Sequence, residues 1–220
     1  MARSFKFDFL KGVLPQKLSE IQYNSRFSEL KTVVSVEDDW GGAVLCCIVE
    51  DSLLYIKRTE SMPTHKGQVA FMGGHKQESE CPTQTVLREL EEEGGIASEH
   101  IQIHGYLPAL FTARKQLIIP VVGELSLTIS ELKKTIASNG EWDICFAVKI
   151  EALSDIEKWS YAQKWGAISD EAILFRGLGI HEVELMRNYG ELVHNFVLWG
   201  ATAHFTNSFL KAITDPGSPL

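Results

Sequence analysis

The stretch that decides the fold is GHKQESECPTQTVLRELEEEGGI, residues 74–96, in which a glycine turn leads into a short acidic helix. Side chains three and four positions apart lie on one side of an α-helix, so Glu89, Glu92 and Glu93 project together. Three carboxylates this close repel one another at neutral pH unless a cation lies among them. Hard oxygen ligands of this kind suit Mg²⁺ or Mn²⁺, which carboxylates bind together with substrate phosphates. The stretch therefore predicts a divalent metal site and a phosphate-containing substrate.

An acidic surface helix is the alternative interpretation, because exposed helices often carry several glutamates. Glu91 fits that description, since it points away from the other three glutamates. A solvated helix has no need, however, of a glycine pair before it or of an arginine beside its carboxylates. Gly73 and Gly74 form that pair and Arg88 lies next to Glu89, so we favour the metal site.

The stretch resembles the signature of the Nudix hydrolases, G-x5-E-x7-R-E-U-x-E-E-x-G-U, where U is an aliphatic residue. Every specified position is matched, by Gly74, Glu80, Arg88, Glu89, Leu90, Glu92, Glu93, Gly95 and Ile96. The resemblance implies an α/β fold, a Nudix-type α/β/α sandwich with a mixed β-sheet, and hydrolysis of a diphosphate linked to another group. It also implies that Glu89, Glu92 and Glu93 bind Mg²⁺ or Mn²⁺, with the backbone carbonyl of Gly73 as a further ligand.

The remaining catalytic roles follow from the same resemblance. Arg88 is expected to orient a glutamate through a bidentate ion pair, and Glu80 is expected to support the structure. The general base stays open between Glu93 and Glu141, which we expect on a loop before a strand. For Glu141, a solvated loop carboxylate is an equal alternative.

Residues before the stretch resemble a further signature, L-L-T-x-R-S-x3-R-x3-G-x-V-x-F-P-G-G, of the coenzyme A pyrophosphatase branch of the family. The positions that fit are Arg58, Gly67, Val69, Phe71, Gly73 and Gly74. The segment LWGATA at 198–203 also resembles a segment near the end of that branch, so the likeness covers about residues 43–213. It implies cleavage of coenzyme A or acyl-coenzyme A into 3′,5′-ADP and 4′-phosphopantetheine, or its acyl form.

Two departures from the branch pattern bear on the substrate. Pro63 stands in place of an arginine, which removes a contact to a phosphate such as the 3′-phosphate of coenzyme A, and Met72 stands in place of a proline. Positive charge could still come from four residues, for which ordinary solvation is an equal alternative: Lys57, Arg58, His65 and Lys66. Phe71 and Met72 could line a pocket for adenine or an acyl-pantetheine arm, although we favour core packing for Phe71. For Trp199 we favour core packing over a role as a platform for the substrate.

Three hypotheses for the function follow. The first is a coenzyme A diphosphatase. The second is a Nudix hydrolase of ADP-ribose, a nucleoside diphosphate sugar or a nucleoside triphosphate. The third is a ligand-binding module without turnover, which usually lacks a signature glutamate, whereas Glu89, Glu92 and Glu93 are all present here.

The composition excludes several kinds of partner. The chain carries 21 basic and 29 acidic residues, a net charge of −8, whereas general nucleic-acid and anionic-membrane binders usually show a basic patch. We expect a small-molecule nucleotide diphosphate as the partner, with no nucleic acid and no membrane. No run is apolar enough for a signal peptide or a bilayer span, and Cys46 and Cys47 fit a reducing compartment, so we expect a cytoplasmic protein.

The pattern along the chain predicts one main domain with a short extension. Apolar residues at helical spacing within 15–32 predict a helical extension over residues 1–35. A homodimer contact and a lid are the two roles that we consider for this extension. The Nudix domain is expected over residues 36–220. Strands are predicted at 43–49, 53–58, 69–71, 101–106, 117–122 and 145–150, and further helices at 131–137, 151–159 and 201–213. Strands and helices intermix without a regular βαβ order, which favours a mixed sheet with helices on both faces.

Overall fold

A computed structural model describes residues 40–112, 116–155, 159–162, 172–175, 183–188 and 197–214. The predicted extension at 1–35 lies outside these residues. The helices of the described residues are α3 (Pro82–Gly94), η2 (Ser98–His100), α4 (Ile129–Thr135), α5 (Ile150–Leu153) and α6 (Gly200–Thr214). The strands are β1 (Gly42–Val49), β2 (Ser52–Arg58), β3 (Val69–Ala70), β4 (Met72–His75), β5 (Ile101–Tyr106), β6 (Leu110–Phe111), β7 (Leu117–Leu125), β8 (Trp142–Lys149), β9 (Trp159–Ala162), β10 (Ala172–Phe175), β11 (Val183–Asn188) and β12 (Leu198–Trp199).

The main sheet is mixed, as predicted. Its strand order is β11-β8-β2-β1-β7-β5, with β3 beside β2, β4 beside β1 and β6 beside β7. The strands β1 and β7 pair in parallel, and the other neighbours pair antiparallel. The predicted strands at 43–49 and 53–58 are confirmed as β1 and β2, which pair through Val49 and Ser52 across a tight turn.

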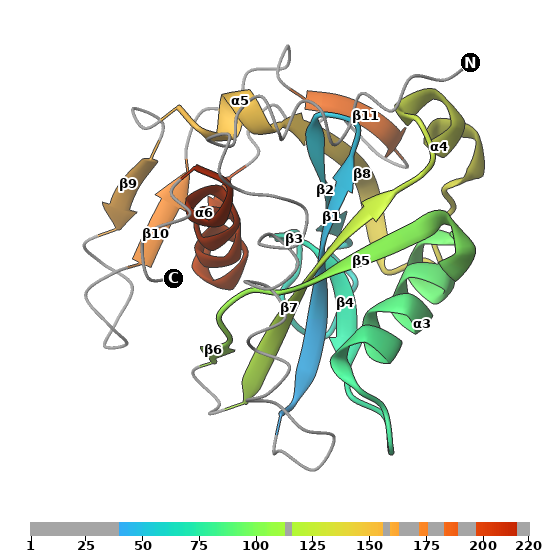
Figure 1. Cartoon of the computed structure of the whole chain (residues 1–220), viewed down its shortest axis with the longest axis horizontal. Coiled ribbons are helices and arrows are strands. Elements are labelled where there is room, and N and C mark those ends of the chain that lie inside the picture. The colour runs from blue at the N-terminus through green and yellow to red at the C-terminus, as the bar shows by residue number, and fades with distance from the viewer. Residues whose placement is uncertain are drawn as a thin grey trace.

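Helices cover both faces of this sheet (Figure 1). Side chains of α3 and α4, such as Val86, Leu90 and Leu132, pack with one set of buried sheet residues. Side chains of α6, such as Phe205 and Phe209, pack with the other set. Because side chains alternate along a strand, β1 places Cys46 in the second core and Cys47 in the first. The predicted α/β/α sandwich is therefore present.

The acidic helix is α3, and its ends follow standard capping chemistry. Pro82 occupies the start of the helix, where a missing N–H costs nothing. Gly95 ends it with a left-handed φ of 65°, a conformation that glycine adopts without strain. Its N–H bonds to the carbonyls of Leu90 and Glu91.

The predicted helix at 151–159 is wrong beyond its first turn. The helix α5 ends at Leu153, and Trp159 begins β9, which pairs with β10. The indole Nε1 of Trp159 donates to the carbonyl of Leu153 at 2.7 Å. Apolar residues three apart therefore did not mark a continuous helix, because the chain leaves the helix after one turn and packs its tryptophan back against it.

No helix of the described residues is long and apolar enough to cross a membrane.

Candidate active site

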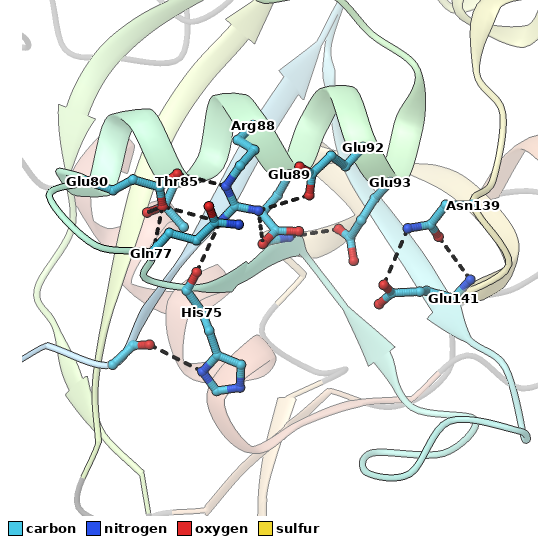
Figure 2. Close-up of polar contacts among 12 residues, drawn as sticks. His75, Gln77, Glu80, Thr85, Arg88, Glu89, Glu92, Glu93, Asn139 and Glu141 are labelled. Atoms are coloured by element: carbon cyan, nitrogen blue, oxygen red, sulfur yellow. Dashed lines mark hydrogen bonds and ion pairs between the residues drawn. The ribbon is translucent and has the colours of Figure 1, made fainter.

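Arg88 connects the carboxylates of the acidic helix (Figure 2). Its guanidinium forms a bidentate pair with Glu80, through Nε to Oε1 at 2.7 Å and Nη2 to Oε2 at 3.2 Å. Its Nη1 donates to Glu89 at 2.8 Å and to Glu92 at 2.9 Å. Its Nη2 also donates to the carbonyl of His75 at 3.1 Å, which ties the helix to β4. Arg88 therefore orients two of the predicted metal ligands and fixes the helix to the glycine turn.

Glu80 holds Arg88 in place from the loop before α3. Its Oε2 accepts hydrogen bonds from the hydroxyl of Thr85 at 2.7 Å and from the N–H of Gln77 at 3.0 Å. The hydrogen bond from Arg88 is the largest cause that lowers the pKa of Glu80 to about 2. The charged carboxylate is thus stabilised by the folded protein.

We expect Glu80→Gln to lower the free energy of unfolding by about 2 kcal/mol at neutral pH, because the pKa of Glu80 is depressed in the folded protein. A depressed pKa contributes stability above the ordinary value of 4.5, and that contribution is lost as the pH falls toward 2. Urea denaturation at several pH values measures it. The wild type and the variant should converge in acid, and a difference that is constant with pH contradicts the assignment.

Glu93 is the buried carboxylate of the cluster. Its side chain is 1% exposed and its Oε2 accepts a hydrogen bond from the N–H of Gly73 at 3.0 Å. The guanidinium of Arg58 lies 4.0 Å from its Oε1. Burial raises the pKa of Glu93 to about 8, and the carboxylates of Glu89 and Glu141 add to the rise. The metal-free site therefore disfavours a charge that a bound cation would stabilise.

Glu89 and Glu141 bring further negative charge to the same place. Burial raises the pKa of Glu89, and Glu92 and Glu141 add to the rise while Arg88 opposes it. Glu141 lies just before β8, where its carboxylate faces Glu93 (Figure 2). It accepts hydrogen bonds from Arg58 at 3.3 Å and from the amide of Asn139 at 3.3 Å, and it remains 40% exposed. Glu141, far from α3 in the sequence, thus belongs to this cluster.

The donor set suits a hard divalent cation. Within the described ranges, no three His, Cys, Asp or Glu side chains already meet in a way that could hold a metal ion. The hydrogen bonds explain this, because Arg88 binds Glu89 and Glu92 whereas Glu93 accepts from Gly73. The raised pKa values of Glu89 and Glu93 nevertheless reflect buried, poorly neutralised carboxylates, which is the environment that a cation stabilises.

The glycine pair lies between the carboxylates of α3 and strand β1. Gly73 and Gly74 lie in β4, which pairs antiparallel with β1. A Cβ atom on Gly74 would overlap the carboxylate of Glu89, and one on Gly73 would lie 2.6 Å from the Cα of Val44. Gly73 also has a φ of 148°, which side chains rarely adopt. The absence of side chains here lets the helix and its carboxylates approach the strand.

We expect Gly74→Ala to fold but to bind Mn²⁺ at least about tenfold more weakly, because the new methyl group displaces the flexible end of Glu89. Gly73→Ala is the contrasting variant. Its methyl group meets the backbone of Ala43 and Val44, which cannot move aside cheaply, so thermal unfolding should occur at a lower temperature. Calorimetric titration with Mn²⁺ and thermal melts of both variants separate the two effects. Unchanged Mn²⁺ affinity in Gly74→Ala contradicts the role of Glu89 as a ligand.

A cavity of about 320 Å³ lies between the sheet and the start of α6. Gly73 and Gly74 form part of its lining, so it borders the same glycine pair as the carboxylates. Of the predicted substrate contacts, Arg58, His65 and Phe71 line it. Lys57, Lys66 and Met72 are not among its lining residues, and Met72 is buried in the core under α3.

Sequence reasoning missed several residues of this lining. Gln68, His75 and Thr202 carry polar groups there, and Trp199, for which core packing was favoured over a substrate platform, is 37% exposed. His75 directly follows the glycine pair, so its place could have been inferred from that turn. Trp199 and Thr202 belong to the segment LWGATA at 198–203 noted above, whereas no specified position of either signature marks Gln68.

Comparisons with known proteins identify the family of the chain. A sequence profile described as "NUDIX domain" matches residues 40–162, so the chain belongs to the Nudix family. "Nudix hydrolase 3" of Caenorhabditis elegans is 29% identical over 140 residues, which cover 63% of this chain and 53% of that protein. "Uncharacterized Nudix hydrolase NudL" of Pectobacterium atrosepticum is 36% identical over 80 residues, covering 36% and 42% respectively.

The chain spans about half the length, or less, of these curated relatives. Among solved structures, a C. elegans Ap4A hydrolase complex aligns with a TM-score of 0.43 and 20% identity, over 53% of this chain and 83% of that one.

Proposed function

We propose that the chain hydrolyses the diphosphate linkage of coenzyme A or acyl-coenzyme A to 3′,5′-ADP and 4′-phosphopantetheine, or its acyl form. One observation supports this most directly: a largely apolar cavity and a cluster of carboxylates share the wall formed by Gly73 and Gly74. An elongated substrate could therefore place its diphosphate at the carboxylates and one of its ends in the cavity. Nudix hydrolases act on small nucleotide derivatives of this kind, generally with a divalent metal ion.

The residues of the cluster have two roles in this proposal, metal binding and orientation of the metal ligands. Glu89, Glu92, Glu93 and the carbonyl of Gly73 would hold Mg²⁺ or Mn²⁺. When bound, such an ion neutralises charge on the diphosphate and makes a water molecule more acidic. Arg88 keeps two of the ligands oriented through its hydrogen bonds.

We propose that Arg58 binds a phosphate oxygen of the substrate. It lines the cavity, and its Nη1 and Nη2 face Glu93 and Glu141. Its side chain is 16% exposed, so a phosphate in the cavity could reach it. A phosphate is the acceptor that an arginine fork suits best.

Glu141 is our candidate for the general base. Glu93 is buried and is needed as a ligand, whereas Glu141 is 40% exposed and can meet a water molecule. Its position beside Glu93 puts it at the cluster where the attacking water would lie (Figure 2).

A hydrolysis screen tests the proposal. Coenzyme A, acetyl-coenzyme A, ADP-ribose, sugar nucleotides and nucleoside triphosphates are incubated with the protein and Mg²⁺ or Mn²⁺, and the products are separated chromatographically. We expect 3′,5′-ADP from coenzyme A, and its loss in Glu92→Gln. Absence of 3′,5′-ADP from wild-type reactions overturns the proposal.

ADP-ribose or a nucleoside diphosphate sugar is the second candidate substrate. Pro63 replaces the arginine of the coenzyme A branch, and in the structure it lies exposed in the loop after β2, outside the cavity lining. A substrate without a 3′-phosphate needs no arginine at that position. Cleavage confined to these compounds in the same screen would select this alternative.

A further inference from the structure

Trp199 lies at the junction between β12 and α6, with its indole partly open to solvent. Its side chain is 37% exposed, whereas that of the preceding Leu198 is fully buried. Alternation along the strand explains the difference, because Leu198 packs into the core and Trp199 faces the other way. Trp199 helps to line the cavity, together with Phe71 and Phe205. An indole in this position offers an apolar surface that folding has not fully covered.

The backbone around Trp199 holds this surface in place. Gly200 has a φ of 57°, a left-handed turn that lets α6 start directly after the strand. In the first turn of α6, the hydroxyl of Thr202 donates to the carbonyl of Val69 in β3 at 3.0 Å. Thr206 and Tyr55 form a further hydrogen bond, which is buried, between the helix and β2 at 2.9 Å. These contacts tie the start of α6 to the sheet and so limit the movement of the cavity wall.

The size of the cavity limits what can occupy it. About 320 Å³ is at the lower end of the range for small-molecule pockets, about 300–1,000 Å³, so it suits one part of a coenzyme-sized molecule. Basic and glycine residues that border the carboxylates, Arg58, Gly73 and Gly74, form one part of the lining. Trp199, Gly200 and Ala201 form another part. A molecule with its diphosphate at the first group would bring the adjacent group to Trp199.

We propose that Trp199 stacks on the nucleobase of the substrate, so that the nucleoside end is recognised in this cavity. This inference rests on the proposed function, since it assumes a nucleoside diphosphate at the carboxylates. A flat indole matches the face of a base, and the amide groups of Gln68 and Gln116 in the lining can meet polar base edges. A flexible aliphatic arm would gain little from either feature. The pantetheine end of the substrate therefore extends away from this cavity.

Binding measurements without turnover test the stacking. Calorimetry with the full chain in EDTA uses AMP and 3′,5′-ADP as ligands with a base, and inorganic pyrophosphate and 4′-phosphopantetheine as ligands without one. We expect Trp199→Ala to weaken binding of AMP and 3′,5′-ADP by about tenfold or more, because base–aromatic stacking contributes at that level. Trp199→Phe should retain most of the affinity, and the ligands without a base should be unaffected.

Phe111→Ala is the matched control. Phe111 is also an exposed aromatic residue, 67% exposed, but it is not part of the cavity lining. Its replacement should leave all four affinities unchanged, and thermal melts of each variant verify folding. Equal weakening of ligands with and without a base in Trp199→Ala overturns the inference, as does unchanged AMP binding or a wild type that shows no saturable AMP binding.

The outcome can be separated from that of the proposed function. Selective loss of base-containing ligands in Trp199→Ala supports stacking even if coenzyme A is not hydrolysed. Hydrolysis of coenzyme A with the same KM in the wild type and Trp199→Ala overturns the stacking but leaves the proposed function in place.

Discussion

Replacing Glu93 by glutamine is expected to reduce kcat for diphosphate hydrolysis by about 10²- to 10³-fold, the effect typical of removing one fixed electrostatic group from an active site. Glutamine preserves the shape of the side chain and can still accept the hydrogen bond from Gly73. It removes the negative charge that would bind the cation. The measurement is steady-state hydrolysis of the substrate found in the screen, with Mg²⁺ and with Mn²⁺.

The loss of activity in Glu93→Gln should occur without loss of stability. Because the pKa of Glu93 rises from 4.5 to about 8 on folding, the metal-free protein loses stability from this group as the pH rises between those values. Glutamine carries no such charge, so the variant should be at least as stable as the metal-free wild type at about pH 8. Glu91→Gln, which changes an exposed glutamate of the same helix, should retain full activity. Equal activities of Glu93→Gln and Glu91→Gln would exclude a catalytic role for Glu93.

Arg88→Ala is expected to lower the free energy of unfolding by about 3 kcal/mol, because removing the central member of a partly buried charged network leaves the carboxylates of Glu80 and Glu89 unpaired. The lost contacts are those with Glu80, Glu89 and Glu92 and with the carbonyl of His75. The guanidinium is 19% exposed, so little water is available to replace them. Urea denaturation in EDTA measures the change.

Arg88→Lys separates charge from geometry. A lysine keeps the positive charge but cannot reproduce the bidentate pair with Glu80 while also reaching Glu89 and Glu92. Its stability should therefore lie between those of the wild type and Arg88→Ala. A loss below about 1 kcal/mol in Arg88→Ala would show that the network behaves as an ordinary surface ion pair.

Local patterns predicted the features that depend on local contacts. The spacing of residues 74–96 gave α3, its glycine ends and the exposed position of Glu91. Alternating and continuous apolar runs gave β1, β2, β5 and β7 within a few residues. The helix α4 starts at Ile129, ahead of the predicted position, because Thr128 and Glu131 form a capping box.

The features that the sequence did not reveal depend on contacts between distant segments. The favoured core packing of Phe71 is confirmed, since Phe71 is 3% exposed and stacks on Tyr55, but it also lines the cavity, whereas the adjacent Met72 packs under α3 in the other core. The sequence alone does not say which side becomes the cavity. Core packing was likewise favoured for Trp199. Its exposure depends on how α6 packs against β3, which residues near it in the sequence do not determine.

The central position of β1 divides the site into two parts of different adaptability. This strand is buried on both faces and pairs with β2, β4 and β7, so the wall formed by Gly73 and Gly74 belongs to the part of the fold that opens least readily. The wall contributed by α6 lies outside this sheet, and most of the contacts of α6 with strands are with β10 and β12 of the smaller sheet. Substitutions in α6 could therefore alter which molecule is accepted while the groups beside Gly73 stay in place. A fold arranged in this way can acquire new substrates in evolution while its reacting groups stay unchanged.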